Sequence, residues 1–151
     1  MPNLKFRFST RELGFGAQRC LMKHRNLARV AMRAVRDTVL KAAVDRCPKK
    51  EGNLAMSITG DVVEMEKSFA ATCYIPINAP CMAATEDKDG NPLPPPDSYA
   101  VWIHEGFYNL GKNSLEKQKK VGVKVGRKFI TRAIDDKREE IIKNLERCVK
   151  L

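Results

Sequence analysis

The chain is poor in the residues on which most enzymes and metal sites depend. Its 151 residues include two histidines, one tryptophan and five cysteines. An odd number of widely spaced cysteines, with no CxxC pair among them, argues against a disulfide framework and against a zinc site. We therefore expect reduced thiols that are buried as small apolar side chains, in a protein that folds in a cytoplasm.

Long apolar runs are also lacking. No stretch of about eighteen apolar residues occurs, so the sequence predicts no transmembrane helix and no membrane partner. The first residues contain neither an apolar run of about seven residues nor a small-residue cleavage site, and we expect no signal peptide there. With 43% hydrophobic and 30% charged residues, the chain should fold around one ordinary core.

No group of side chains suits catalysis by a recognised arrangement. His24 lies between two cations and has no acid near it in sequence. His104 and Glu105 could form a base with an orienting carboxylate, but adjacent residues on a strand point to opposite faces, which disfavours the pair. Neither a GxSxG serine nor a phosphate-binding loop with a GK[ST] ending is present. We therefore expect no enzymatic activity and no catalytic residues.

Two conceivable metal sites fail on spacing. Counted from Asp87, the sixth position of a calcium loop is Pro92, where glycine is required, and the twelfth is Ser98, where a bidentate glutamate belongs. The segment is better explained as a β-turn. A second set has neither ligand spacing nor a fourth ligand: Cys73, Cys81 and His104. The sequence therefore predicts neither a metal nor a cofactor.

Charge is segregated along the chain. Of the net charge of +10, residues 1–50 carry +10, residues 51–111 carry −7, residues 112–128 carry +6 and residues 129–151 carry +1. A basic, acidic, basic order suits a surface that meets either a polyanion or another copy of the same chain. A solvated basic face with no partner is the alternative.

Two segments have the apolar period of long amphipathic helices. Between His24 and Arg46 apolar residues recur at steps of three and four, and Pro48 should end this helix. Lys128 to Leu151 has the same period and predicts a C-terminal helix. Another face of the first helix carries four arginines as candidates for contact with DNA or a partner: Arg25, Arg29, Arg33 and Arg36.

The region between these helices predicts a small sheet. Ile58 to Met65 has strand character, and Phe69 to Ile77 alternates as a half-buried strand does. The two would form a hairpin, with pairing stopped at Pro76. We therefore predict an α+β fold: a small antiparallel β-sheet packed against a long N-terminal helix and a C-terminal helix.

Two connections should interrupt this single domain of residues 1–151. Residues 78–98 contain five prolines and predict a long loop, either an interface arm that becomes ordered on assembly or a solvent-exposed tether. Residues 111–124 predict a lysine-rich loop, and the alternating valines from Val121 to Val125 would suit a short strand. Further candidates for contact with DNA or a partner lie in this loop: Lys119, Lys120 and Lys124.

Three short segments, taken in order and at their spacing, resemble the small head–tail connector proteins of tailed bacteriophages, also called neck, tail-completion or minor capsid component proteins. They are CPKKEGNLAMSI (residues 47–58), YAVWIHEG (99–106) and GRKFI (126–130), and the resemblance spans about residues 20–151. Cys47 stands where the family usually has alanine, and both connections are longer than the family's compact versions. The motif residues carried over are Pro48, Gly52, Leu54, Ile58, Tyr99, Trp102, Gly106 and Phe129.

The resemblance implies a purely architectural role. Such subunits form a ring, commonly sixfold, in the virion neck between the portal-side adaptor and the tail, after assembly in the host cytoplasm. The expected partners are copies of the chain itself, neighbouring connector and tail proteins, and genomic double-stranded DNA met non-specifically in the lumen. Tyr99, Trp102 and Phe107 should then serve as core and corner packing. The alternatives are a tail terminator ring and a free basic nucleic-acid-binding protein.

Overall fold

The computed structural model describes residues 5–9, 14, 16, 19, 22–66 and 68–149. The described elements are, in order, β1 (Lys5–Ser9), α2 (Arg25–Arg46), α3 (Asn53–Ser57), β2 (Val62–Met65), β3 (Ser68–Tyr74), α4 (Pro96–Glu105), α5 (Lys112–Val121) and α6 (Phe129–Val149). This confirms the expected α+β class, with a small antiparallel sheet, a long N-terminal helix and a C-terminal helix. Among the described residues, no helix is both long and apolar enough to span a membrane.

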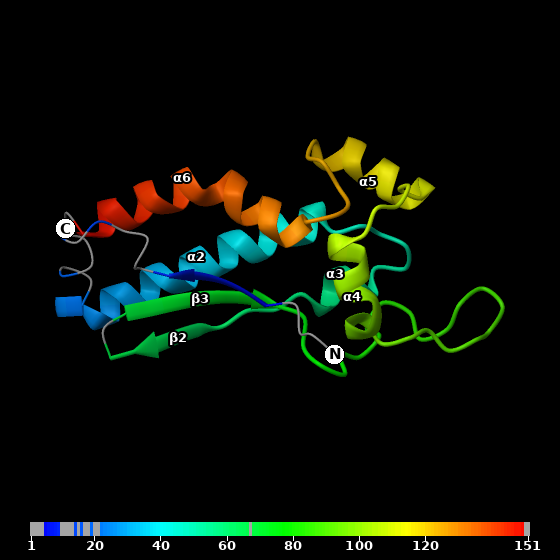
Figure 1. The fold of residues 1–151 in the computed structure, drawn as a ribbon, viewed down its shortest axis with the longest axis horizontal. Helices are drawn as coiled ribbons and strands as arrows, with labels where there is room; N and C mark the ends of the chain where they lie inside the picture. The colour runs from blue at the N-terminus through cyan, green and yellow to red at the C-terminus, as the bar shows by residue number, and fades with distance from the viewer. Residues whose placement is uncertain are drawn as a thin grey trace.

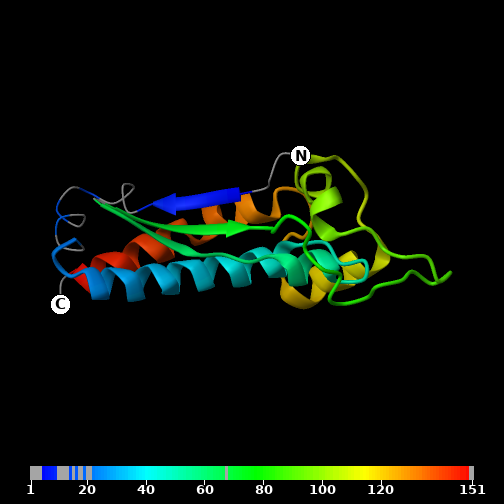
Figure 2. The same ribbon diagram turned by 90° about the horizontal axis from the view of Figure 1, so that it is seen from below.

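The two long helices and the sheet form two layers. α2 and α6 run antiparallel, side by side, beneath the three-stranded sheet, whose order is β1-β3-β2 (Figures 1 and 2). The stripe of α2 that faces this core includes Ala28, Val35 and Ala43, all buried. Their small or branched side chains let α6 and β3 pack closely against α2. The apolar period in the sequence therefore marks the face of α2 that is buried in the core.

The central strand β3 is more deeply buried than its alternation predicts. Phe69, Ala71 and Cys73 face the core as expected, but Ala70 and Thr72 on the other face are also buried. β3 pairs with β1 on one side and β2 on the other, so neighbours flank its small side chains on both sides. The prediction of a half-buried strand was therefore wrong. The β2–β3 hairpin and the end of pairing before Pro76 are confirmed.

The strand predicted over residues 58–65 is shorter than expected, since the regular strand β2 begins only at Val62, after the single-turn helix α3 and an isolated bridge. Gly52 has a φ of 107°, a left-handed conformation that glycine adopts without strain, and it caps the single-turn helix α3. Pairing with β3 then begins at Thr59 as an isolated bridge and becomes regular only from Val62. A Cβ at Gly60 would overlap the Thr72 carbonyl oxygen, so the two backbones come too close there for any other residue.

The proline-rich connection contains a small hairpin, which we call the arm (residues 81–95). The Leu93 amide donates to the Thr85 carbonyl at 2.8 Å and the Asp87 amide donates to the Asn91 carbonyl at 2.8 Å. The Asp87 carboxylate accepts from the Asn91 amide at 2.9 Å, so this aspartate closes a β-turn as expected. The loop ends earlier than expected, because α4 begins at Pro96, a residue well suited to the first turn of a helix.

Two further helices lie where none was predicted. The YAVWIHEG motif (residues 99–106) belongs to α4, whose buried residues Pro96, Ala100 and His104 recur at a helical step of four. The expected lysine-rich loop at 111–124 is mostly the helix α5, and Val121 to Val125 form no strand. α5 is closed by Gly122, which has a φ of 70°. The low apolar content of α5 concealed it, because only one narrow face contacts the body of the protein.

Candidate functional site

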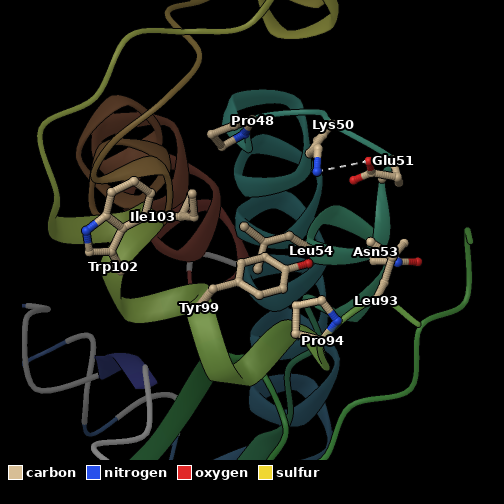
Figure 3. A pocket seen from close by; sticks show the side chains of 11 residues that line it. Pro48, Lys50, Glu51, Asn53, Leu54, Leu93, Pro94, Tyr99, Trp102 and Ile103 are labelled. Atoms are coloured by element: carbon tan, nitrogen blue, oxygen red, sulfur yellow. Dashed lines mark ion pairs between the residues drawn. The ribbon is translucent and has the colours of Figure 1, made fainter. Parts of the chain in front are cut away.

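An apolar groove of about 320 Å³ lies between the turn after α2, the short helix α3, the base of the arm and α4 (Figure 3). Residues 48–54 form one wall, Leu93 and Pro94 the second, and α4 the third. All of these elements gather at the end of the molecule where α2 finishes and α6 begins (Figure 1). Groove-lining residues come from every wall: Pro48, Lys50, Glu51, Gly52, Asn53, Leu54, Leu93, Pro94, Tyr99, Trp102 and Ile103.

The groove brings together two sequence motifs that are about fifty residues apart in the chain. Pro48, Gly52 and Leu54 from the first motif line this space together with Tyr99 and Trp102 from the second. Two further motif residues are buried near the groove. Ile58 is buried where α3 ends, and Phe129 is fully buried at the start of α6. The eight motif residues therefore belong to one end of the fold.

A steric contact explains why residue 106 is a glycine. It ends α4, and its amide donates to the Trp102 carbonyl at 2.7 Å. A Cβ at this position would collide with the same carbonyl oxygen. Glycine is therefore required for the chain to leave α4 while Trp102 remains at the rim of the groove.

Trp102 and Phe107 are not core residues. Trp102 is 60% exposed and Phe107 is 84% exposed, which contradicts the expectation that they act as core and corner packing. Trp102 stacks on Tyr108, with ring centroids 5.5 Å apart, and the Arg127 guanidinium lies 3.7 Å above the Phe107 ring. Large apolar side chains exposed beside a groove are typical of a surface that another molecule covers.

The polar groups of the groove suit binding better than catalysis. Burial raises the pKa of Tyr99 to about 12, so its hydroxyl remains neutral and protonated at physiological pH. At the mouth, the Lys50 ammonium lies 3.4 Å from the Glu51 carboxylate, as the dashed line in Figure 3 marks. Tyr99, Lys50 and Glu51 are the ionisable side chains that line the described groove, and they form no nucleophile–base pair.

Asn53 is a functional position that the sequence did not single out. It is 3% exposed, and its side-chain oxygen accepts from the amides of Ala83 and Ala84 at 2.7 and 3.0 Å. Its side-chain nitrogen donates to the Ala84 carbonyl at 2.7 Å. One amide therefore ties the base of the arm to the groove. The only sequence signal was its place directly after the glycine of the first motif.

His104 and Glu105 meet, although they were expected to point apart. Because they lie on a helix and not on a strand, the His104 Nδ1 approaches a Glu105 carboxylate oxygen to 2.6 Å. The imidazole is fully buried and packs edge-on against Phe129, with ring centroids 5.0 Å apart. Burial lowers its pKa, and this effect outweighs the hydrogen bond to Glu105, which raises it. A substrate in solvent would have no direct access to this ring.

The four arginines of α2 fall into different environments. Arg25 and Arg29 lie 3.4 and 2.6 Å from the Glu64 carboxylate on β2, and Arg36 lies 2.7 Å from Asp37. Arg33 is exposed, and in the described part of the chain no acid lies within ion-pair distance of it. Part of the basic–acidic segregation is therefore neutralised within one chain.

The candidate lysines lie apart from these arginines. Lys119 and Lys120 are exposed on α5 and Lys124 is exposed just after it, at the opposite end of α2 from Arg25 (Figure 1). The structure does not bring the two basic sets together into a single patch.

The described cysteine and acidic side chains form no cluster that suits a metal ion. Within the described ranges, no group of three or more histidine, cysteine or acidic residues is placed to hold a metal ion. The described cysteines are free thiols, and burial raises the pKa of both Cys47 and Cys73 to about 12. Their thiols are therefore protonated and unreactive at neutral pH.

Comparison with known proteins gives no relative for this chain: no family model, no curated protein and no solved structure matches it.

Proposed function

We propose that this chain is a non-enzymatic structural subunit of the neck of a tailed bacteriophage, where about six copies form a ring that joins the DNA-filled head to the tail. One observation carries the proposal. The segments that resemble connector proteins, separate in sequence, converge on one groove and its immediate support.

The chemistry of the groove supports an architectural role. Its walls are largely apolar, its buried tyrosine is neutral, and Trp102 is exposed at its rim. Exposed aromatic residues beside a concave apolar surface are the usual anchors of protein–protein interfaces. The partners in this proposal are further copies of the chain and the adjoining connector and tail proteins.

The exposed cations are further candidates for contact, although they lie apart. Arg33 on α2 and Lys124 after α5 are exposed and belong to different elements of the fold. In a ring, bases of this kind that face the lumen would attract DNA phosphates without reading sequence.

Loss of the gene in the phage that encodes the chain tests this role. We expect DNA-filled heads and free tails that do not join, visible by electron microscopy, and restored joining when the wild-type chain is supplied. Trp102→Ala should restore joining poorly because it removes the exposed anchor, whereas Val30→Ala should restore it fully. Val30 is a matched control, since it is 61% exposed but lies on α2. Normal joining without the chain would contradict the proposal.

The two alternatives give different results in the same experiments. A tail terminator ring stops tail growth, so its loss would give overlong tails in place of unjoined particles of normal length. A free nucleic-acid-binding protein would show DNA affinity that falls steeply with salt in the purified chain. Because Arg25 and Arg29 already pair with Glu64, fewer cations of α2 are available for that second role.

A further inference from the structure

The helix α5 has one face turned to the body of the protein and one turned to solvent. On the inner face, the Ser114 hydroxyl accepts from the Lys49 amide at 2.9 Å, and the Lys117 ammonium donates to the carbonyls of Val44 and Cys47. Half a turn away, the outer face is exposed throughout: Lys112, Leu115, Glu116, Lys119 and Lys120.

The outer face of α5 has the pattern of a docking helix. Leu115 is 45% exposed, and Lys112 and Lys119 lie about one helical turn before and after it. In the described part of the chain, neither lysine has an acid within ion-pair distance. The outer face therefore presents one apolar side chain between two cations, with Glu116 beside them.

The groove has the complementary pattern. Its walls are largely apolar, Glu51 at its mouth is paired with Lys50, and the arm beside it carries Glu86, Asp87 and Asp89. Glu86 and Asp89 are exposed, and among the described residues neither has a cation within ion-pair distance. An apolar groove beside an acidic arm matches an apolar side chain that lies between lysines.

We propose that α5 of one copy docks in the groove of a second copy, with Leu115 in the groove and Lys112 and Lys119 facing the acids of the arm. This contact deepens the proposed function, on which it rests, by naming the surfaces through which copies meet. It joins two different patches, as the contacts of a closed ring must. At about 1.5 Å per residue, this ten-residue helix is long enough to cross a groove of this size.

A second copy explains this surface better than DNA does. The acids of the arm would repel phosphate, and Leu115 gains little from contact with a phosphate backbone. The contact is also between chains and not within one, because the inner face of α5 is already fixed against residues 44–49 and turns Leu115 outward.

Charge reversal on each side of the contact provides the test. The helix variant is Lys112→Glu with Lys119→Glu, and the arm variant is Glu86→Lys with Asp89→Lys. All four positions are exposed, so both variants should unfold at the wild-type temperature. A control variant, Lys41→Glu with Lys143→Glu, makes the same change in charge as the helix variant at exposed positions outside the contact.

Sedimentation velocity at low salt measures the assembly of each protein. We expect the wild type and the control to self-associate, and each contact variant to lose affinity by about tenfold or more. Leu115→Asp should lose at least as much. Mixing the helix and arm variants in equal amounts should restore assembly, because every contact in the mixture again joins opposite charges. A wild type that stays monomeric, variants that associate normally, or a mixture without rescue would each overturn the contact.

The mass of the assembled species separates this contact from the ring. A wild-type dimer that never grows, but that depends on Leu115 and is rescued in the mixture, would support the contact and contradict the proposed ring. A ring that persists in all variants would support the proposed function and overturn the contact.

Discussion

The imidazole of His104 lies where a positive charge is costly. It is fully buried against Phe129, and burial is the main cause that lowers its pKa from the ordinary value of 6.5. Around it, Glu105 favours the charged form, and Lys128 and Arg132 disfavour it. When the pH falls below 6.5, the unfolded chain takes up the proton first, so folding stability decreases with falling pH until the folded form is protonated as well.

A His104→Gln variant tests this pH dependence. We expect the wild type to lose more unfolding free energy than the variant between about pH 8 and about pH 5, because glutamine does not titrate in this range. Urea unfolding at each pH measures the difference. Other acids titrate equally in both proteins, so their effects cancel. Identical pH profiles for the two proteins would show that His104 is not a neutral buried histidine.

Two glycines at the ends of the α4–α5 connection should respond in opposite ways to alanine. Gly106→Ala places a Cβ against the Trp102 carbonyl oxygen and should lower the unfolding free energy by about 1–3 kcal/mol. Gly111 has a φ of −69° and open space where its Cβ would be, so Gly111→Ala should be neutral or slightly stabilising. Thermal unfolding of both variants checks this. An equal loss in the two would mean that close approach at Gly106 is not the reason for glycine there.

At the scale of elements, α5 is fixed by Lys117. Its ammonium donates to the carbonyls of Val44 at 2.5 Å and Cys47 at 2.8 Å, which belong to the last turn and cap of α2. Burial lowers the pKa of Lys117, yet these two acceptors stand at the negative end of the α2 dipole and hold the ammonium in place.

Replacing this lysine with methionine keeps the length of the side chain and removes the donor. Lys117→Met should therefore lower the unfolding free energy by about 1–3 kcal/mol, because the α2 carbonyls lose their partner. Lys119→Met, on the outer face of the same helix, should change it by less than about 0.5 kcal/mol. Chemical denaturation measures both, and an equal effect would show that Lys117 does not connect α5 to α2.

The arm depends on Asn53 in a similar way. Asn53→Ala removes three hydrogen bonds to Ala83 and Ala84, so the arm should open more often while the core remains folded. We expect faster tryptic cleavage after Lys88, which is exposed at the tip of the arm. Asn113→Ala is a suitable control, because it removes an exposed side-chain hydrogen bond to the Lys50 carbonyl, outside the arm. Unchanged cleavage at Lys88 would show that other contacts hold the arm.

The sequence predicts elements well where one residue pattern determines the structure. α2 and α6 bury continuous apolar stripes, so their period reveals them, and Pro48 marks the end of the first. α4 and α5 were missed because they contact the body through narrow faces, and α4 resembles a short strand in its apolar content. The burial of both faces of β3 depends on its flanking strands, which no local pattern in β3 reveals.

The sequence predicted several residues of the candidate site, but it did not predict that they line a groove. Pro48, Gly52, Leu54, Tyr99 and Trp102 were selected through a resemblance, and their meeting in a groove is a product of the tertiary fold. The exposure of Trp102 was not predicted, since a lone tryptophan in an apolar segment is more often buried. Asn53 was overlooked because its role depends on Ala83 and Ala84, thirty residues further along the chain.

At the scale of the whole molecule, some of the described charged side chains form ion pairs and others are exposed to solvent. Arg25 and Arg29 pair with Glu64, and the buried Arg46 lies 2.6 Å from Asp136, so α2 uses several cations to hold its own fold together. Exposed lysines lie on α5 and exposed acids lie on the arm. These two elements are separate projections at one end of the fold (Figure 1). A molecule arranged in this way is better suited to meeting its own copies than to coating DNA uniformly.

We propose that the chain is a ring subunit of the phage neck. The most direct measurement is to count its copies in purified particles of the phage that encodes it, by quantitative mass spectrometry, and to locate them by electron microscopy. We expect about six copies per particle, all at the junction of head and tail. Infectious particles that contain none of the chain would contradict the account.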